Sequence, residues 1–397
     1  MKLKSRTLSF RAPARGTVAY EFAYYTRPTG WDQLRLRHLE LRDDIYDGGE
    51  FAFSNDNGRT WPEVQPYRMS DTTAQGVIRR NQRAGFVDPL NGRLLQLEMQ
   101  GLLRNDHALD GLAAWHLRYR VSEDGGRTAL VEAPVVQDGF TPTHPFAPIW
   151  VGKNAMMLCS NGAILRCQQG HLLVATQFTP LGTDGRLHNP GGGYTWTEVL
   201  LLFGHWQDDG RIQWKTGSRL GIGPDRSTRG LIEPTLTQMP DGRILMVLRG
   251  SNDAHAQLPG HKWHCISNNG GRIWTAPQPW RYSDGTPFFS PSSCSQFLTH
   301  SSGRRFWLGN LCPSNPAGSH PRYPLVAGEV DPVSLGLIRE SLCLVDTRQP
   351  DDPPSLMLSN FYAHEDRASG ELVVWMTRMT AEHGELNGDV YLYRIEL

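Results

Sequence analysis

The sequence lacks a surplus of charge of either sign. Its 397 residues carry 40 Lys+Arg and 40 Asp+Glu, so the formal net charge is zero. Broad electrostatic capture of nucleic acid needs a dominant basic face, which this balance does not supply. Long apolar runs are also missing, since no stretch approaches the roughly 18 residues that suggest a membrane-spanning helix. We therefore expect neither nucleic acid nor a membrane as a partner.

Cysteine is scarce, and its spacing indicates no chemistry. The six cysteines form no CxxC pair and no metal-ligand pattern, which is typical of small buried thiols in a reducing compartment. No glycine-rich phosphate loop and no G-x-S-x-G elbow occurs either. The first 16 residues are basic but lack the apolar core of a signal peptide. We expect a cytoplasmic chain without a metal or cofactor, although secretion after removal of a signal stays open.

Helical periodicity is rare, whereas short runs of β-branched and aromatic residues recur along the chain. Many follow a glycine turn: RLLQLEM follows Asn91-Gly92, ILMVLRG follows Asp241-Gly242, and RFWLGNL follows Gly303. Such turns join antiparallel strands because Gly and Asn tolerate positive φ. No linker or change in composition interrupts the series. The sequence predicts one all-β domain spanning residues 1–397, built by repetition.

One turn motif, S-x-D-x-G-x-T-W, occurs three times. Residues 54–61 read SNDNGRTW, residues 122–128 read SEDGGRT, and residues 267–274 read SNNGGRIW. The Asp or Asn closes a tight turn onto backbone amides, the Gly takes the left-handed position, and the Trp packs beneath the turn. Asp56 and Trp61 are therefore expected to be structural residues.

These motifs resemble the Asp-box (BNR) repeats of the sialidase superfamily, whose members are six-bladed β-propellers. Six units can be counted, and they begin near Thr17, Val77, Ala163, Glu233, Ser293 and Pro354. A seven-bladed ring is the alternative, because residues 179–214 are loosely punctuated. The run DVYLYRIEL at the C-terminus is expected to pair with LSFRAPA near the N-terminus, which would close the ring.

The resemblance also implies a site. In this family the innermost strand of each blade begins at the active face, and the second strand ends there. Glu233 opens EPTLTQM and Arg249 closes ILMVLRG, so the two side chains are expected to meet there. They match a functional Glu and the second arginine of a triad that binds the substrate carboxylate, a task that suits the planar guanidinium fork. Arg322 is the candidate for the third arginine. Arg11 is the candidate for the first, with Arg27, Arg35 and Arg37 as rivals.

The family's acid/base aspartate lies in a loop shortly before the first Asp box. Here that loop contains Asp43, Asp44 and Asp47, and Asp44 is our first choice. Clustered carboxylates raise one another's pKa, which suits a proton donor near neutral pH. His144 is an alternative acid or base, because it lies in a connection between units. The ends of other second strands are candidates for sugar contacts: Gln177, Asn310 and Arg378.

The sequence departs from the family where the nucleophile should stand. Sialidases use a tyrosine that opens the inner strand of the last blade, but the matching segment here is DDPPSLML, with Pro353. Tyr362 is expected in a hairpin loop on the opposite face. An inverting reaction remains open, since it needs only one carboxylic acid and one carboxylate with water between them.

Three functions follow as alternatives. The first is a glycoside hydrolase that acts on a terminal acidic sugar. The second is a propeller polysaccharide lyase, or a glycosidase of uronate linkages, that uses histidine chemistry. The third is a propeller that binds carbohydrate without turning it over. A carbohydrate is the expected partner in all three, and the oligomeric state stays open.

Overall fold

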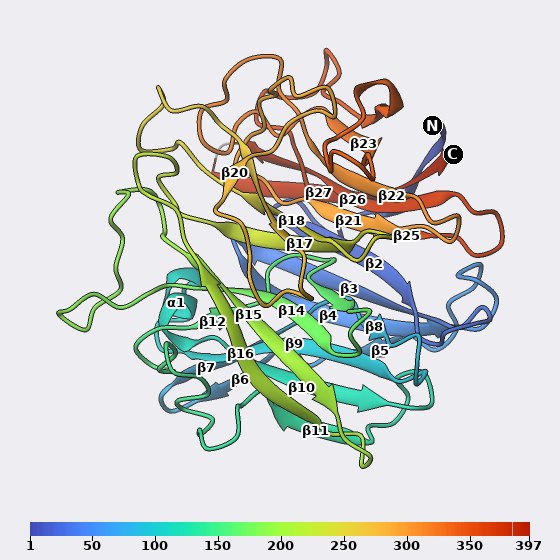
Figure 1. Ribbon diagram of the computed structural model, residues 1–397. Coiled ribbons are helices and arrows are strands. Elements are labelled where there is room, and N and C mark those ends of the chain that lie inside the picture. The colour runs from blue at the N-terminus through green and yellow to red at the C-terminus, as the bar shows by residue number, and fades with distance from the viewer. Residues whose placement is uncertain (383) are drawn as a thin grey trace.

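The computed structural model describes residues 1–382 and 384–397. Nearly all regular structure in these residues is β-strand, arranged in five hydrogen-bonded sheets (Figure 1). The helical elements are single turns: η1 (Ala108–Asp110), α1 (Gly111–Ala114) and η2 (Arg339–Ser341). No helix among the described residues has the length and apolar character needed to cross a membrane.

Two sheets consist of four antiparallel strands that follow one another in the chain. The first contains β17 (Ile232–Gln238), β18 (Ile244–Arg249), β19 (Lys262–Ser267) and β20 (Gln278–Pro279). The second contains β21 (Gln296–Thr299), β22 (Arg305–Asn310), β23 (Leu325–Glu329) and β24 (Cys343–Asp346).

Two further sheets have the same meander, but their innermost strand is interrupted. One contains β6 (Ser70–Thr73), β7 (Gly76–Gln82), β8 (Phe86–Val87), β9 (Leu94–Leu103), β10 (His116–Ser122) and β11 (Val131–Pro134). The other contains β12 (Met156–Met157), β13 (Ile164–Arg166), β14 (Leu172–Phe178), β15 (Glu198–Trp206) and β16 (Ile212–Leu220). β7 and β8 both pair with β9, and β12 and β13 both pair with β14.

The eight-stranded sheet joins the two ends of the chain. Its strands are β1 (Lys2–Phe10), β2 (Val18–Tyr25), β3 (Gln33–Arg42), β4 (Ile45–Ser54), β5 (Gln65–Pro66), β25 (Met357–Glu365), β26 (Leu372–Glu382) and β27 (Glu385–Glu396). β1 pairs along β27, as the sequence predicts, and the two termini lie side by side in Figure 1. A single parallel bridge, Val18↔Gly388, connects β25–β27 with β2–β5.

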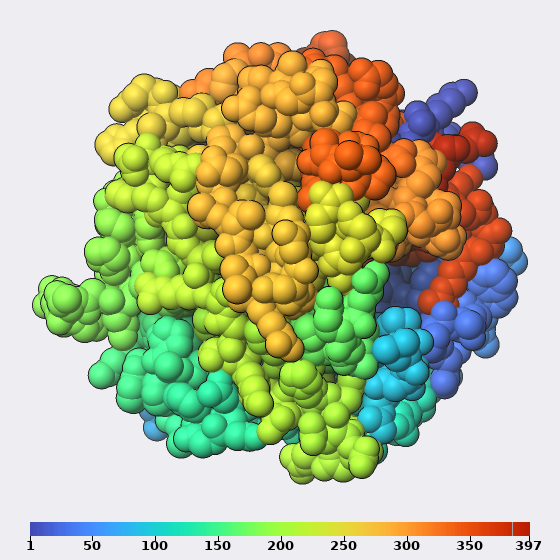
Figure 2. All heavy atoms as spheres, viewed as in Figure 1, coloured from blue at the N-terminus to red at the C-terminus, as the bar shows by residue number. Residues whose placement is uncertain are grey.

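The core lies between neighbouring sheets. Every residue of β14 and of β18 is buried, because both faces of each strand are covered. One apolar cluster joins these two strands across the gap between their sheets, through Leu173, Ala175, Met246 and Leu248. Figure 2 shows that segments from the middle of the chain, green to orange, cover much of one face.

The repeated turn motif has the predicted geometry. The Asp56 carboxylate accepts hydrogen bonds from the backbone N–H groups of Arg59 (3.0 Å) and Thr60 (2.9 Å). Asp124 and Asn269 accept equivalent bonds in the other two copies. The Trp61 ring was expected to pack beneath the turn, but it is only half-buried. The Arg35 guanidinium lies 5.0 Å from the centroid of this ring.

Two strand boundaries differ from those predicted. The third unit begins at Met156 rather than near Ala163, because its first strand is split by the turn at Ser160–Gly162. Tyr362 lies within β25 rather than in a hairpin loop, and its partly buried ring packs against Phe22 at 5.6 Å between centroids. The loop begins only after Glu365, since the pairing of β25 with β26 continues through His364 and Glu365.

Candidate active site

Glu233 and Arg249 meet where β17 begins and β18 ends. Ile232 pairs with Arg249, and the ladder then shifts, which leaves Glu233 in a bulge with a left-handed φ of 48°. Arg249 donates from Nη1 to Glu233 Oε1 at 2.9 Å and from Nε to Ser292 Oγ at 2.8 Å. The hairpin register thus brings together the two residues that the sequence singled out.

Two residues that were predicted to contact a sugar instead form hydrogen bonds to the backbone of the site. The Gln177 side-chain oxygen accepts a 2.7 Å hydrogen bond from the Glu233 backbone N–H, which fixes the bulge. Asn310 is fully buried and donates to the carbonyl oxygens of Arg322 (3.1 Å), Pro324 and Leu358. Asn310 therefore anchors the chain that carries Arg322, just before β23.

Arg322 lies near Arg249 in a crowded, positively charged environment. Burial lowers the pKa of Arg322, and the charge of Arg249 lowers it further, against the attraction of Glu233. Its Nε is buried and has no hydrogen-bond partner among the described residues. This nitrogen therefore retains an unused hydrogen-bond donor.

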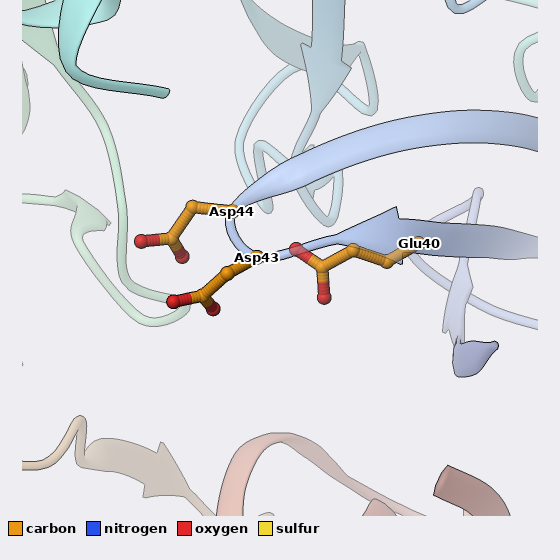
Figure 3. Close-up of side chains that lie close together, drawn as sticks. All are labelled: Glu40, Asp43 and Asp44. Atoms are coloured by element: carbon orange, nitrogen blue, oxygen red, sulfur yellow. The ribbon is translucent and has the colours of Figure 1, made fainter. Parts of the chain in front are cut away.

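Asp43 and Asp44 form the turn between β3 and β4, at the same end of the strands as Glu233. Asp44 is exposed to solvent at its surface, yet the surrounding protein desolvates its carboxyl, and this desolvation, followed by the negative charge of Asp43, raises its pKa despite the opposing charges of Arg249 and Arg322. The side chains of Glu40, Asp43 and Asp44 lie close together (Figure 3), with one carboxylate oxygen of each within 4.8 Å of the others. Burial raises the pKa of Glu40 to about 8. Three carboxylates so close also form a donor set of the kind that hard cations use.

The Glu233 carboxyl is shifted in the opposite direction. Burial alone would raise its pKa, but the charge and hydrogen bond of Arg249, with the charges of Arg322 and Lys262, hold it below the usual value. Glu233 Oε2 is buried and has no hydrogen-bond partner in residues 1–382 and 384–397. Asp44, Glu233, Arg249 and Arg322, which we call the mouth cluster, thus contain one carboxyl biased toward protonation and one biased toward ionisation.

Sequence reasoning missed three cations beside this cluster. Arg83 occupies the interruption between β7 and β8, donates to Leu158 O at 2.8 Å, and interacts with Tyr46 and Glu233. Arg229 precedes β17, and burial and the charge of Arg249 lower its pKa to about 10. Lys262 is fully buried at the start of β19, and burial lowers its pKa to about 7. The Ala-Gly break after Arg83 was the one local signal of an interrupted strand.

Lys262 stabilises the loop that binds Arg249. Its Nζ donates to the carbonyl oxygens of Pro291 (3.2 Å) and Ser293 (2.5 Å), on either side of the Ser292 hydroxyl that binds Arg249. These bonds fix the loop before β21. Arg249 is consequently held from both Glu233 and Ser292.

Several predicted residues are engaged elsewhere. Arg11 is exposed and forms an ion pair with Asp389 (3.9 Å), because β1 lies on the outer edge of its sheet. Arg378 is bound by Asp346 and Asp352. The His144 ring stacks on Trp150 at 3.6 Å and contacts Ile149 O at 2.7 Å. None of the interactions described for these three residues reaches the mouth cluster.

The rivals of Arg11 and the third loop aspartate are also occupied. Arg27 binds Asp32 at 3.0 Å, and Arg35 and Arg37 bind Glu21. Asp47 forms ion pairs with Arg42 (2.6 Å) and Arg79 (3.3 Å). These contacts give Asp47 and the rival arginines structural partners.

Asn360, rather than Pro353, occupies the position in β25 that Glu233 occupies in β17. Both strands shift register near their start, and both residues have left-handed φ values, 58° for Asn360 and 48° for Glu233. Pro353 lies in the preceding loop. The Asn360 N–H donates to Cys294 Sγ at 3.3 Å. Asn360 is exposed, although most other residues of β25 are buried.

Two cavities lie away from the mouth cluster, between the outer strands of the first unit and β9–β10. Their volumes are about 420 and 550 Å³, and they share Tyr67, Gln82, Gln96 and Arg120 as lining residues. Neither is lined by Glu233 or Asp44.

Comparison with known proteins gives structural matches only. No protein-family model and no curated protein sequence matches the chain. The fold is similar to that of a K499G mutant of the NanB sialidase from Streptococcus pneumoniae, with a TM-score of 0.59 and 12% identity over 97% of this chain and 70% of that one. It is similar to an intramolecular trans-sialidase from Ruminococcus gnavus, with a TM-score of 0.59 and 12% identity over 96% and 94%.

The match extends beyond sialidases. An α-L-arabinanase from Penicillium chrysogenum has a TM-score of 0.57 and 15% identity over 99% of this chain and 98% of that one. The chain therefore has the fold shared by these sialidases and this arabinanase. At such identities the likeness establishes the fold and leaves the substrate to the chemistry of the site.

Proposed function

We propose that the protein is a glycoside hydrolase that cleaves a terminal carboxylated sugar from its neighbour. The observation that carries the proposal is the opposite bias of Asp44 and Glu233 within one arginine-rich site. A carboxyl with a raised pKa can donate a proton, and one with a lowered pKa can accept one, which is the division of labour that glycoside hydrolysis needs.

The proposed reaction uses these two groups and one water. Protonated Asp44 gives its proton to the glycosidic oxygen, and the bond from that oxygen to the anomeric carbon breaks with its electron pair leaving on oxygen. Water attacks the anomeric carbon and gives its proton to Glu233. The unpartnered Oε2 of Glu233 supports the role of base. The proposed reaction uses no tyrosine nucleophile, because Asn360 stands near the start of β25 in the position that Glu233 has in β17.

The cations of the mouth suit a carboxylated substrate. Arg249 already donates a hydrogen bond to Glu233. We therefore assign binding of the substrate carboxylate to Arg322, whose Nε has no partner among the described residues. Arg83 and Arg229 add positive charge on either side. The sialidase matches agree with such a substrate, whereas the arabinanase match makes a neutral furanoside the alternative to be tested.

We also propose that the sheets form six blades. The eight-stranded sheet divides at the single Val18↔Gly388 bridge into two four-stranded groups, one of which combines β25–β27 with β1. With the other four sheets this gives six units, and the first and last are closed by the two ends of the chain. The three turn motifs then represent Asp boxes.

The decisive experiment is hydrolysis of a panel of aryl sialosides, uronides and α-L-arabinofuranosides by the wild-type protein and two variants. Glu233→Gln should lower kcat at least about 100-fold on the substrate that is cleaved. Asp44→Asn should do the same for a poor leaving group but much less for dinitrophenolate, which needs no proton. Asp32→Asn, at the opposite end of β3, is the matched control.

The panel also separates the alternatives. An unsaturated product absorbing in the ultraviolet would establish a lyase in place of the hydrolase. Saturable sugar binding without turnover would establish a binding protein, the reading that Asn360 at the place of a nucleophile favours. Full activity in Glu233→Gln would overturn the assignment of the base.

A further inference from the structure

An exposed aromatic ring lies on the rim beside the mouth cluster. Tyr194 is 56% exposed, in the loop between β14 and β15 that contributes to the green projection at the left of Figure 2. Three glycines precede it, at positions 191–193. An exposed tyrosine alone indicates little, so its support and its neighbours decide whether it can bind a ligand.

The loop is held rigidly behind the ring. The Tyr194 N–H donates to Asp253 Oδ2 at 3.1 Å, while Thr228 donates to the other carboxylate oxygen of Asp253. Asn189 donates to Gly193 O at 2.8 Å. A Cβ on Gly193 would lie 2.6 Å from Thr228 O, so only glycine permits this approach. The ring therefore projects from a fixed backbone.

The same loop runs beside the segment that leads into Glu233. Thr197 accepts a bond from the Leu231 N–H at 3.0 Å and donates from its own N–H to Arg229 O at 3.2 Å. The Arg229 guanidinium lies 5.4 Å from the Tyr194 ring centroid, close enough for a cation–π contact. The Nε and Nη2 atoms of Arg229 donate to Thr195 Oγ1. Its Nη1 has no hydrogen bond to any residue that the structure describes, so this nitrogen can donate to a ligand.

The Tyr194 loop is packed against the segment that leads into Glu233, through the bonds of Thr197 and the Arg229 contact. The charges of Asp44 and Asp43 contribute, after burial, to the raised pKa of Tyr194, as expected for a phenol on the same side of the site. In glycoside hydrolysis the leaving group lies next to the acid that protonates it. A flat aromatic surface and a guanidinium on that side match the C–H face and hydroxyl groups of a second sugar ring.

We propose that Tyr194 and Arg229 form a subsite for a leaving group that is itself a sugar, so that the natural substrate is an oligosaccharide. This inference rests on the proposed function. It adds that binding energy comes from the leaving sugar as well as from the terminal one. The subsite is built by packing between two loops far apart in sequence, 189–197 and 226–231.

The test compares substrates that share a terminal sugar but differ in leaving group. The probe pairs are sialyl fluoride with sialyllactose, and α-L-arabinofuranosyl fluoride with arabinobiose. Tyr194→Ala should lower kcat/KM for the oligosaccharide about 10-fold, the loss of one stacking contact, and leave the fluoride unchanged. Tyr194→Phe should retain most activity. Trp31→Ala, an exposed aromatic on the β2–β3 turn, is the matched control.

Each outcome has one meaning. Equal losses for fluoride and oligosaccharide in Tyr194→Ala, or no loss for either, would overturn the subsite while the wild-type activity upholds the hydrolase. A wild-type protein that cleaves neither member of either pair, nor any glycoside of the panel, would overturn the hydrolase and the subsite with it. Product inhibition gives a second measurement, because lactose or arabinose should inhibit wild type more strongly than Tyr194→Ala.

Discussion

Asp43 offers the most direct test of how the proposed acid is tuned. Its carboxylate lies in the same turn as Asp44, and its negative charge is the second cause, after desolvation, of the raised pKa of Asp44. Asp43→Asn removes that charge with little change in shape. Ionised Asp44 then becomes less unfavourable, so its pKa falls, and the protonated form required for catalysis disappears at a lower pH.

The size of the shift follows from the separation of the charges. The carboxyl oxygens lie within 4.8 Å of each other. Two unit charges at that distance interact by about 3.5 kcal/mol at an effective dielectric constant near 20 and about 0.9 kcal/mol in water, or about 2.5 to 0.6 pKa units. Asp43 is exposed, so screening favours the lower part of this range, and we expect about one unit.

The assay is the pH dependence of kcat/KM on the best substrate of the panel, which reports the free protein. The alkaline limb should move to lower pH by about one unit in Asp43→Asn, and the acid limb, which reports Glu233, should move less. Asp32→Asn serves as the control because its partner is Arg27, at the other end of the strands. An unchanged alkaline limb in Asp43→Asn, or an equal shift in the control, would refute the assignment of Asp44 as acid.

Two further predictions concern charge and packing. Arg249→Lys keeps the charge but loses the bonds to Glu233 and Ser292, so kcat/KM for a carboxylated substrate should fall about 30-fold. Its acid limb should also move to higher pH, and an unmoved limb would contradict the role of Arg249 in ionising Glu233. Trp61→Ala should cost only about 1–2 kcal/mol in urea unfolding, since the ring is half-buried, with activity per folded molecule unchanged. A larger loss of activity than of stability would place Trp61 at the site.

The pairing of Glu233 with Arg249 was predictable because it is local. A strand, a Pro-Asp-Gly turn and a second strand fix the register of one hairpin, so both ends of that hairpin must lie together. The turn containing Asp43 and Asp44 was located differently, from the resemblance to the loop that precedes the first Asp box, and the structure shows it as the turn of the β3–β4 hairpin.

The residues that were missed depend on packing between sheets. Arg83 lies at the site because the pairing with β9 is interrupted between Gln82 and Phe86, and Lys262 because its ammonium group is buried against the loop before β21. Periodicity does not report either contact. Arg11 shows the converse: its sequence resembles a family motif, but it directly follows β1, which pairs with β27 at the edge of the sheet, and it forms an ion pair with Asp389.

Arg249 links the two halves of the proposed chemistry. A group that binds the substrate carboxylate and a group that keeps Glu233 ionised are separate requirements, and one guanidinium cannot meet both with the same N–H groups. In this protein Nη1 of Arg249 is committed to Glu233 and Nε to Ser292. Arg322 keeps a buried, unpartnered Nε beside it. An anion between these two arginines would relieve the repulsion between them, which is why we assign a carboxylated sugar to this site.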